Sequence, residues 1–215
     1  MNSLLYWLAR LLCKLLFTIG CGLTVYGAEN IPRNSPMIVV ANHASLLDGF
    51  ILAACLPHKI TYFSSAYLFD LPLVGQFLCI IGAIPVEKNE GGIKAIKKAL
   101  RVLEAGGVLG IFPEGGVGSE GKVRDFQPGW SYLAIKSGVP VLPIAILGSS
   151  TVLPLGARIP RRGKITVIIG KPQNFLRELR PRRETMAAAN TCCLKELEYL
   201  LSNRSSGNGG CLPNA

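Results

Sequence analysis

A histidine and an aspartate five positions apart, His43 and Asp48, are the residues whose types and spacing best suit chemistry in this sequence. They lie between an apolar run typical of a buried strand, residues 37–41, and an apolar run typical of a helix, residues 49–54. Residues five apart on one helix point about 140° away from each other, so the two side chains meet only if His43 lies in the turn and Asp48 in the first helical turn. Asp48 would then hold one imidazole nitrogen as N–H and leave the other as a base for an alcohol proton. The alternative is that His43 ends a strand and Asp48 caps a helix, with no chemistry.

A second candidate segment, residues 112–115 with the sequence Phe-Pro-Glu-Gly, also follows an apolar run typical of a buried strand. A lone Pro-Glu-Gly is usually a turn. In an open α/β sheet, however, the carboxyl ends of neighbouring strands line one crevice. The occurrence of both segments at strand ends therefore favours one shared site that contains His43 and Glu114.

Four sequence blocks resemble, in their residues and their order, those of the glycerolipid acyltransferases. The chain is similar to the 1-acylglycerol-3-phosphate (lysophosphatidate) acyltransferase family from about Leu23 to Pro172. The blocks are Asn42-His43 with Asp48, residues 82–86 (Gly-Ala-Ile-Pro-Val), residues 112–115 (Phe-Pro-Glu-Gly) and residues 139–143 (Val-Pro-Val-Leu-Pro). The resemblance implies transfer of a fatty acyl group from acyl-carrier protein or coenzyme A to the hydroxyl of lysophosphatidate, giving phosphatidate in phospholipid biosynthesis.

The resemblance also implies roles for individual residues. His43 would be the general base and Asp48 would orient it. The substrate-binding residues would be Asn42, Lys88, Glu114, Gly115 and Arg124. Neither a metal nor a cofactor is implied, because the acyl donor, acyl-CoA or acyl-carrier protein, is a co-substrate.

Two departures from the family pattern concern the acceptor phosphate. The family continues Pro-Glu-Gly with Thr-Arg-Ser, whereas this chain has Gly116-Val117-Gly118. The arginine that the family has two residues after the second block is Lys88 here, which keeps the charge without the bidentate guanidinium. Arg124 is the expected substitute for the arginine that is missing after Pro-Glu-Gly. Three alternatives therefore remain. The chain is an acyltransferase for a different lysolipid acceptor, a non-catalytic lipid- or carrier-binding protein of the same fold, or a thioesterase or lipid hydrolase.

The composition is apolar and basic at once: 49% of residues are hydrophobic, 17% are charged and the net charge is +10. Soluble proteins average about 25% charged residues, and this combination fits an anionic membrane surface better than a nucleic acid. The seven cysteines form no C-x-x-C pair and no zinc-type cluster with histidine. We expect reduced thiols, no metal site and a cytosol-facing location on a membrane, the inner membrane if the source is bacterial. Cys55 or Cys79 as a nucleophile is an alternative, although both lie in apolar runs typical of buried thiols.

Residues 3–18 are apolar apart from a stripe of other side chains at helical spacing: Ser3, Trp7, Arg10, Lys14 and Thr18. This pattern favours an amphipathic helix lying in the plane of a membrane, with a tilted membrane-spanning helix or a core helix as alternatives. We therefore divide the chain into a membrane-associating helix (1–22), an acyltransferase domain (23–202) and a disordered tail (203–215).

The predicted fold is a single α/β domain with a mixed sheet flanked by helices. Strands are predicted at 23–26, 37–41, 60–63, 80–86, 108–112, 141–147 and 165–169, and helices at 46–56, 92–105, 129–137 and 184–202, with short helical pieces at 66–81. Two basic clusters fall in loops: Arg158, Arg161, Arg162 and Lys164, and then Arg177, Arg180, Arg182 and Arg183. Each is either a solvated loop or a contact for lipid headgroups or an acidic carrier protein. The G-x-G-x-x-G match at 116–121 opens no predicted helix and does not predict a dinucleotide site.

Overall fold

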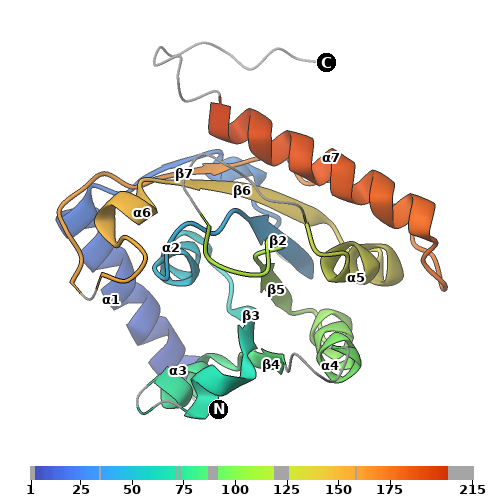
Figure 1. Cartoon of the computed structure of the whole chain (residues 1–215), viewed down its shortest axis with the longest axis horizontal. Helices are drawn as coiled ribbons and strands as arrows, with labels where there is room; N and C mark the ends of the chain where they lie inside the picture. The colour runs from blue at the N-terminus through green and yellow to red at the C-terminus, as the bar shows by residue number, and fades with distance from the viewer. Residues whose placement is uncertain are drawn as a thin grey trace.

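A seven-stranded mixed sheet organises the described part of the chain, in the order β1-β7-β6-β2-β5-β3-β4 (Figure 1). The computed structural model describes residues 3–33, 35–70, 72, 74–86, 92–118, 126–157 and 159–202. The strands are β1 (Thr24–Tyr26), β2 (Met37–Ala41), β3 (Ile60–Ser65), β4 (Ile84–Val86), β5 (Val108–Ile111), β6 (Val141–Leu147) and β7 (Thr166–Ile169). All neighbours pair in parallel except β6 and β7, which pair antiparallel. The predicted mixed α/β sheet is confirmed.

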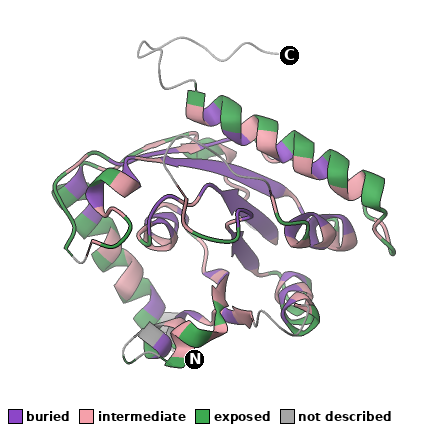
Figure 2. Ribbon diagram, viewed as in Figure 1, coloured by how far each residue is buried: buried purple, intermediate pink, exposed green. Residues whose placement is uncertain are grey.

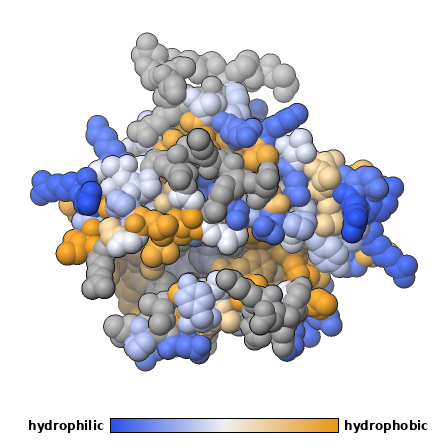
Figure 3. All heavy atoms as spheres, in the orientation of Figure 1, coloured by the Kyte–Doolittle hydropathy of each residue, from blue (hydrophilic) through white to orange (hydrophobic). Residues whose placement is uncertain are grey.

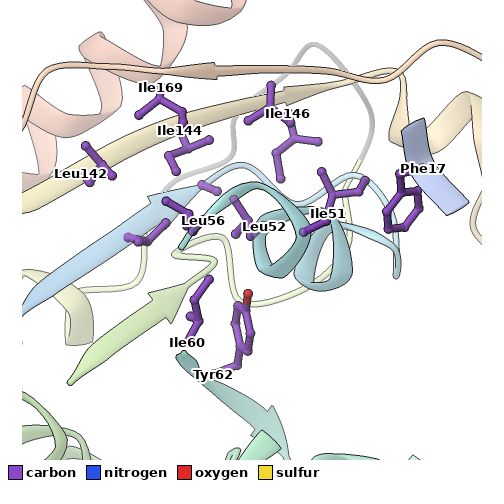
Figure 4. Close-up of a cluster of buried hydrophobic side chains, with 14 of the residues drawn as sticks. Phe17, Ile51, Leu52, Leu56, Ile60, Tyr62, Leu142, Ile144, Ile146 and Ile169 are labelled. Carbon is purple, nitrogen blue, oxygen red and sulfur yellow. The ribbon is translucent and has the colours of Figure 1, made fainter. Parts of the chain in front are cut away.

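Helices cover both faces of this sheet, as parallel strands require. They are α1 (Ser3–Cys21), α2 (Asp48–Cys55), α3 (Val74–Ile81), α4 (Ile93–Glu104), α5 (Gly129–Ser137), α6 (Ser149–Val152) and α7 (Arg183–Ser202), with 3-10 turns at Ala28–Asn30 and Ala66–Asp70. One core joins the sheet to α1 and α2, and Figure 4 shows its side chains, among them Phe17, Leu52 and Ile144. The second core joins the opposite face to α4, α5 and α7. The central strands are buried along their whole length (Figure 2).

The register of the central strands brings the two candidate segments together. Strand β2 lies between β5 and β6, with Val40 opposite Ile111 and Ala41 opposite Ile144. Because β2 and β5 run parallel and end side by side, the residues that follow them, including His43 and Glu114, emerge at the same edge of the sheet.

Some element boundaries differ from the prediction. Helix α2 begins at Asp48 rather than at residue 46, because residues 44–47 form the turn that leads into it. Helix α3 continues through Ile81, so the fourth strand covers only 84–86, after Gly82 with its positive φ of 74°. This strand, β4, lies at the edge of the sheet, where Pro85, which has no N–H to donate, is tolerated. In α4 the buried residues are Ala95, Ala99 and Leu103, whereas Ile93 at its start is exposed.

Helix α1 contacts the domain along one narrow face and leaves most of its apolar surface uncovered. Tyr6, Phe17 and Cys21 are buried, and Arg10 Nε donates to the Leu56 carbonyl oxygen at the end of α2 (2.9 Å). The exposed side carries Leu4, Leu5, Leu8, Leu11, Leu12, Leu15, Leu16 and Ile19. Only 17% of residues 4–21 are buried, and this segment is long and apolar enough to cross a membrane. The exposed apolar face indicates that the protein associates with a membrane. The predicted tail, 203–215, lies outside the described residues.

Candidate active site

The turn that carries His43 is attached to the neighbouring strand by Asn42. Asn42 Nδ2 donates to the Ile146 carbonyl oxygen (2.8 Å), and the Ile146 N–H donates to Asn42 Oδ1 (2.7 Å). The side chain is buried, and it extends the pairing of β2 with β6 by one residue. Asn42 was predicted to bind substrate. Its amide is instead bonded to the backbone, so it positions the His43 turn.

His43 and Asp48 meet as the spacing predicted. The distance from His43 Nδ1 to Asp48 Oδ2 is 3.0 Å, and the same oxygen accepts the backbone N–H of Ala44 (2.7 Å) and of Ser45 (2.8 Å). Asp48 is fully buried and is the first residue of α2, where the helix dipole favours a negative charge. Three donors on one carboxylate oxygen fix the aspartate, and the aspartate fixes the plane of the imidazole. His43 Nδ1 is thereby the N–H nitrogen, and Nε2 is the nitrogen available as a base.

The segment after β5 packs against the other side of His43. The Phe112 ring stacks on the imidazole with centroids 4.1 Å apart and 17° between the planes. Glu114 Oε1 accepts the His43 N–H (2.9 Å), and the Gly118 N–H donates to the His43 carbonyl oxygen (2.7 Å). The backbone of His43 is therefore held at both its donor and its acceptor by residues more than seventy positions away in the sequence.

Tyr62 of β3 lies behind this stack. Its ring is parallel to that of Phe112, with centroids 6.2 Å apart, and its hydroxyl donates to the Gly49 carbonyl oxygen in α2 (2.9 Å). Burial raises the pKa of Tyr62 well above its usual value, so the hydroxyl stays protonated and remains a donor. Tyr62 therefore links the aromatic stack to the helix that carries Asp48.

A cavity of about 620 Å³ opens beside His43. Its walls come from the ends of β3, β4 and β5 and from the first turns of α4 and α5, and they are mostly apolar: Phe63, Leu68, Val86, Ile96, Trp130 and Leu133. Ser64, Ser65, Gly115 and Gln127 also line it. Gly115 has a φ of 73°, which an L side chain rarely adopts, and this lets the chain turn back along the cavity after Glu114. Figure 3 shows a recess with apolar walls near the middle of the viewed face. Its volume suits an organic ligand.

A family model described as Acyltransferase matches residues 22–147. The chain belongs to the acyltransferase family. Among its relatives, a 1-acyl-sn-glycerol-3-phosphate acyltransferase of Bacillus subtilis (strain 168) is 31% identical over 194 residues, which is 87% of this chain and 94% of the relative. A chloroplastic protein of the same name from Brassica napus is 30% identical over 152 residues, 69% of this chain.

The chain spans less than half the length of that chloroplastic relative, 44%. Among solved structures, the 1-acyl-sn-glycerophosphate acyltransferase of Thermotoga maritima superposes with a TM-score of 0.80 at 24% identity, over 95% of this chain and 81% of that one. This likeness shows that the acyltransferase family member described here shares the fold of that enzyme.

Two predicted phosphate contacts of this acyltransferase family member, Lys88 and Arg124, lie outside the described residues. The two alternative nucleophiles, Cys55 and Cys79, lie within the part of the chain that the structure describes. Cys55 is at the end of α2, and burial raises the pKa of its thiol to about 12. Cys79 is exposed, contrary to the expectation of a buried thiol, and neither cysteine lines the cavity. Within the described residues no three His, Cys, Asp or Glu side chains form a group that could hold a metal ion.

Sequence reasoning missed the residues that hold His43 from a distance. Phe112 and Tyr62 lie in predicted strands and Gly118 in the loop after one of them, and only the fold brings Phe112 onto the imidazole, Gly118 to the His43 backbone and Tyr62 behind Phe112. The aromatic residue before Pro-Glu-Gly was the one local signal, because a ring at a strand end next to a predicted site is placed to pack against it. For Tyr62 and Gly118 the sequence carries no such signal.

Proposed function

We propose that the protein transfers a fatty acyl group from acyl-CoA or acyl-carrier protein to the free hydroxyl of lysophosphatidate, giving phosphatidate in phospholipid biosynthesis. The observation that carries this proposal is the pairing of His43 with Asp48 on the wall of an apolar cavity. The relatives named as 1-acyl-sn-glycerol-3-phosphate acyltransferases support the choice of acceptor.

In the proposed mechanism His43 is the general base. Its Nδ1–H donates to Asp48, and Nε2 takes the proton of the acceptor hydroxyl as that oxygen attacks the thioester carbonyl. The tetrahedral intermediate then collapses, the carbon–sulfur bond breaks, and the leaving thiolate takes the proton from Nε2. Because the thioester is already activated, no acyl-enzyme is required. The buried Asp48 carboxylate stabilises the imidazolium that forms between these steps.

The cavity is proposed to hold the acyl chain. Apolar side chains such as Phe63, Ile96 and Leu133 would bury methylene groups, each contributing about 0.8 kcal/mol. Glu114 would act through the backbone of His43, and Gly115 would line the acceptor side. Lys88 and Arg124 are proposed to bind the acceptor phosphate.

The remaining proposals concern partners and location. The protein would need no cofactor, because the acyl donor is a co-substrate. It would bind a lysophospholipid and a membrane surface, and no nucleic acid. Where acyl-carrier protein is the donor, it would bind that acidic protein as well. Residues 1–22 would hold the domain, 23–202, on the cytosolic side of the membrane. The six described cysteines are all free, which supports a reducing compartment.

The test is acyl transfer by the purified protein, with labelled acyl-CoA and acyl-carrier protein and a panel of lysolipids. His43→Ala should lower the rate by about 10²–10⁴. His58→Ala is the matched control, because His58 is the other histidine and its Nε2 bonds the Arg33 carbonyl oxygen away from the cavity. Product on another lysolipid alone would keep the chemistry and change the acceptor. Free fatty acid without an acceptor would indicate a hydrolase, and bound lipid without any product would contradict the enzyme proposal.

A further inference from the structure

The loop between α6 and β7, residues 153–164, exposes apolar side chains at its tip. Leu155 is 71% exposed and Ile159 is 78% exposed, and Pro154 and Pro160 stand beside them. We call this segment the α6–β7 loop. Large aliphatic side chains that project from a loop into water are a feature of binding surfaces, particularly when polar residues surround them.

Hydrogen bonds and close packing fix the shape of the α6–β7 loop. The Arg161 N–H donates to the Val152 carbonyl oxygen (2.7 Å), which closes the base, and the Ala157 N–H donates to the Pro154 carbonyl oxygen (3.0 Å), which forms a turn within the tip. Gly163 packs so tightly on Val152 that an added Cβ would lie 2.9 Å from Val152 Cγ2. With the base closed in this way, the side chains of Leu155 and Ile159 lie on the surface of the protein.

Cations follow directly after the apolar tip. Arg161, Arg162 and Lys164 are exposed, and none of them forms an ion pair with a carboxylate among the described residues. Arg158, the fourth basic residue of the cluster, lies outside the described residues. An apolar tip next to uncompensated positive charge complements the interface of an anionic bilayer, where aliphatic groups enter the acyl boundary and cations bind headgroups.

The α6–β7 loop is bonded to the His43 turn and, at its end, to α1. Ser45 Oγ donates to the Leu153 carbonyl oxygen (2.9 Å), and the Ile165 N–H, just after the loop, donates to the Cys21 carbonyl oxygen at the end of α1 (3.1 Å). Leu46, in the His43 turn, is 61% exposed. Figure 1 places α1 and α6 on one side of the molecule, and Figure 3 shows apolar surface on that side of the viewed face, next to the central recess.

We propose that the α6–β7 loop is a second membrane-contacting element, distinct from α1. Leu155 and Ile159 insert into the interface of an anionic bilayer, while Arg161, Arg162 and Lys164 bind its headgroups. Two membrane contacts, α1 and the α6–β7 loop, lie on the same side of the molecule and together orient the domain on the bilayer. If the proposed function holds, this orientation lets a lipid acceptor pass from the bilayer to His43, but the membrane contact itself does not depend on catalysis.

A second exposed loop supplies a matched control. Leu176 and Leu179, before α7, are 90% and 75% exposed and also lie among arginines. There, however, Arg182 pairs with Glu178 (3.1 Å) and Arg177 Nε donates to the Lys136 carbonyl oxygen (3.3 Å), so part of the positive charge is used within the protein. The start of α7 lies on the opposite side of the molecule from α1 (Figure 1).

The first experiment measures co-sedimentation of the full chain with phosphatidylcholine vesicles, with and without phosphatidylglycerol. Leu155→Ser/Ile159→Ser should weaken partitioning onto the anionic vesicles by about tenfold or more, because two aliphatic side chains no longer leave water. Arg161→Gln/Arg162→Gln should weaken it by about tenfold or more on anionic vesicles and little on neutral ones. Leu176→Ser/Leu179→Ser should bind as the parent protein does. Equal binding by the two serine variants would overturn the proposal.

The second experiment measures insertion directly and does not depend on a loss of binding. Ile159→Trp and Leu176→Trp are mixed with anionic vesicles that contain brominated lipids, and the fluorescence common to both from Trp7 and Trp130 is subtracted. Quenching should increase for Ile159→Trp and not for Leu176→Trp. Absence of quenching in Ile159→Trp would refute insertion. If the arginine variant nevertheless lost binding, the contact with the bilayer would be through charge alone. Should the serine variant fail to fold, the tryptophan pair still decides the matter.

Discussion

The two turns that form the candidate site, one after β2 and one after β5, are stabilised in different ways. In the first, Asp48 accepts the N–H groups of Ala44 and Ser45, so the turn is closed by residues within four positions of one another. In the second, Glu114 and Gly118 bond the backbone of His43, which belongs to the other turn. The first turn carries the reacting group, and the second supports it from outside.

This difference separates the chemistry from its scaffold. A carboxylate that accepts three hydrogen bonds within its own turn is fixed as soon as the turn forms, and it fixes His43 in the same step. The support from Glu114 and Phe112 requires the whole sheet, because β2 and β5 must first pair. Changes in the first turn should therefore affect the rate most, and changes in the second should affect stability first.

The largest effect is expected from Asp48→Asn. An asparagine oxygen can still accept the Ala44 and Ser45 N–H groups, so the fold should persist, but the neutral amide no longer stabilises the imidazolium or fixes the tautomer with the proton on Nδ1. We expect the rate of acyl transfer to fall by up to about 10⁴, the effect of the same change in a Ser-His-Asp triad. Asp70→Asn, the same change at an exposed carboxylate, is the control. A rate for Asp48→Asn near that of the parent would show that the pair is only structural.

A smaller effect is expected in the second turn from Glu114→Ala. It removes the acceptor of the partly buried His43 N–H, and the loss of this partner should lower the free energy of unfolding by about 1 kcal/mol or more. Glu114→Gln keeps an oxygen in place and should lose much less stability, as urea denaturation of both variants would measure. If the two variants were equally destabilised, acceptance of this hydrogen bond would not be the role of Glu114.

The sequence predicted the first turn better than the second for the same physical reason. The meeting of His43 and Asp48 follows from local periodicity, and the two strand ends were recognisable as apolar runs followed by polar residues. The attachment of Asn42 to Ile146 spans 104 positions, so no local pattern indicates it. For that reason Asn42 was assigned to substrate binding, although its amide bonds a neighbouring strand.

The fold was predictable where periodicity was clear and less so where an apolar run was continuous. Residues 80–86 read as one strand, yet the first two residues complete α3 and the last three form β4. A continuous apolar run does not distinguish a helix end from a strand, and the informative residue was Gly82 with its positive φ. In α1, Arg10 was predicted on a polar stripe. It instead bonds the end of α2, a contact 46 positions away that spacing alone cannot indicate.

Substitution of two glycines by alanine should sharpen the comparison, because one substitution should lower the free energy of unfolding and the other should raise it. Gly115, in the second turn, has a φ of 73°, and an added Cβ would lie 3.3 Å from Gln127 Cγ, so Gly115→Ala should cost about 1–2 kcal/mol. Gly49 lies in α2 with nothing within 4 Å of an added Cβ, so Gly49→Ala should add about 0.5–1 kcal/mol. Urea denaturation measures both free energies of unfolding. Changes of the same sign would contradict this account of the two turns.

The smallest effect on activity is expected from alkylation of the cysteines. Burial raises the pKa of Cys55 to about 12 and also raises that of Cys193, so few of these thiols are thiolates at pH 8, and thiolate is the form that reacts. Among the six described cysteines, iodoacetamide at pH 8 should therefore label the exposed Cys79 and Cys192 first, as peptide mass mapping over time would show. Labelling of Cys55 should still be accelerating as the pH rises toward 12. Acyl transfer should survive labelling of the exposed pair, since His43 and Asp48 act on the alcohol without a thiol. A rate that fell in step with modification of Cys79 would make a cysteine the nucleophile and reduce the His43 turn to its support.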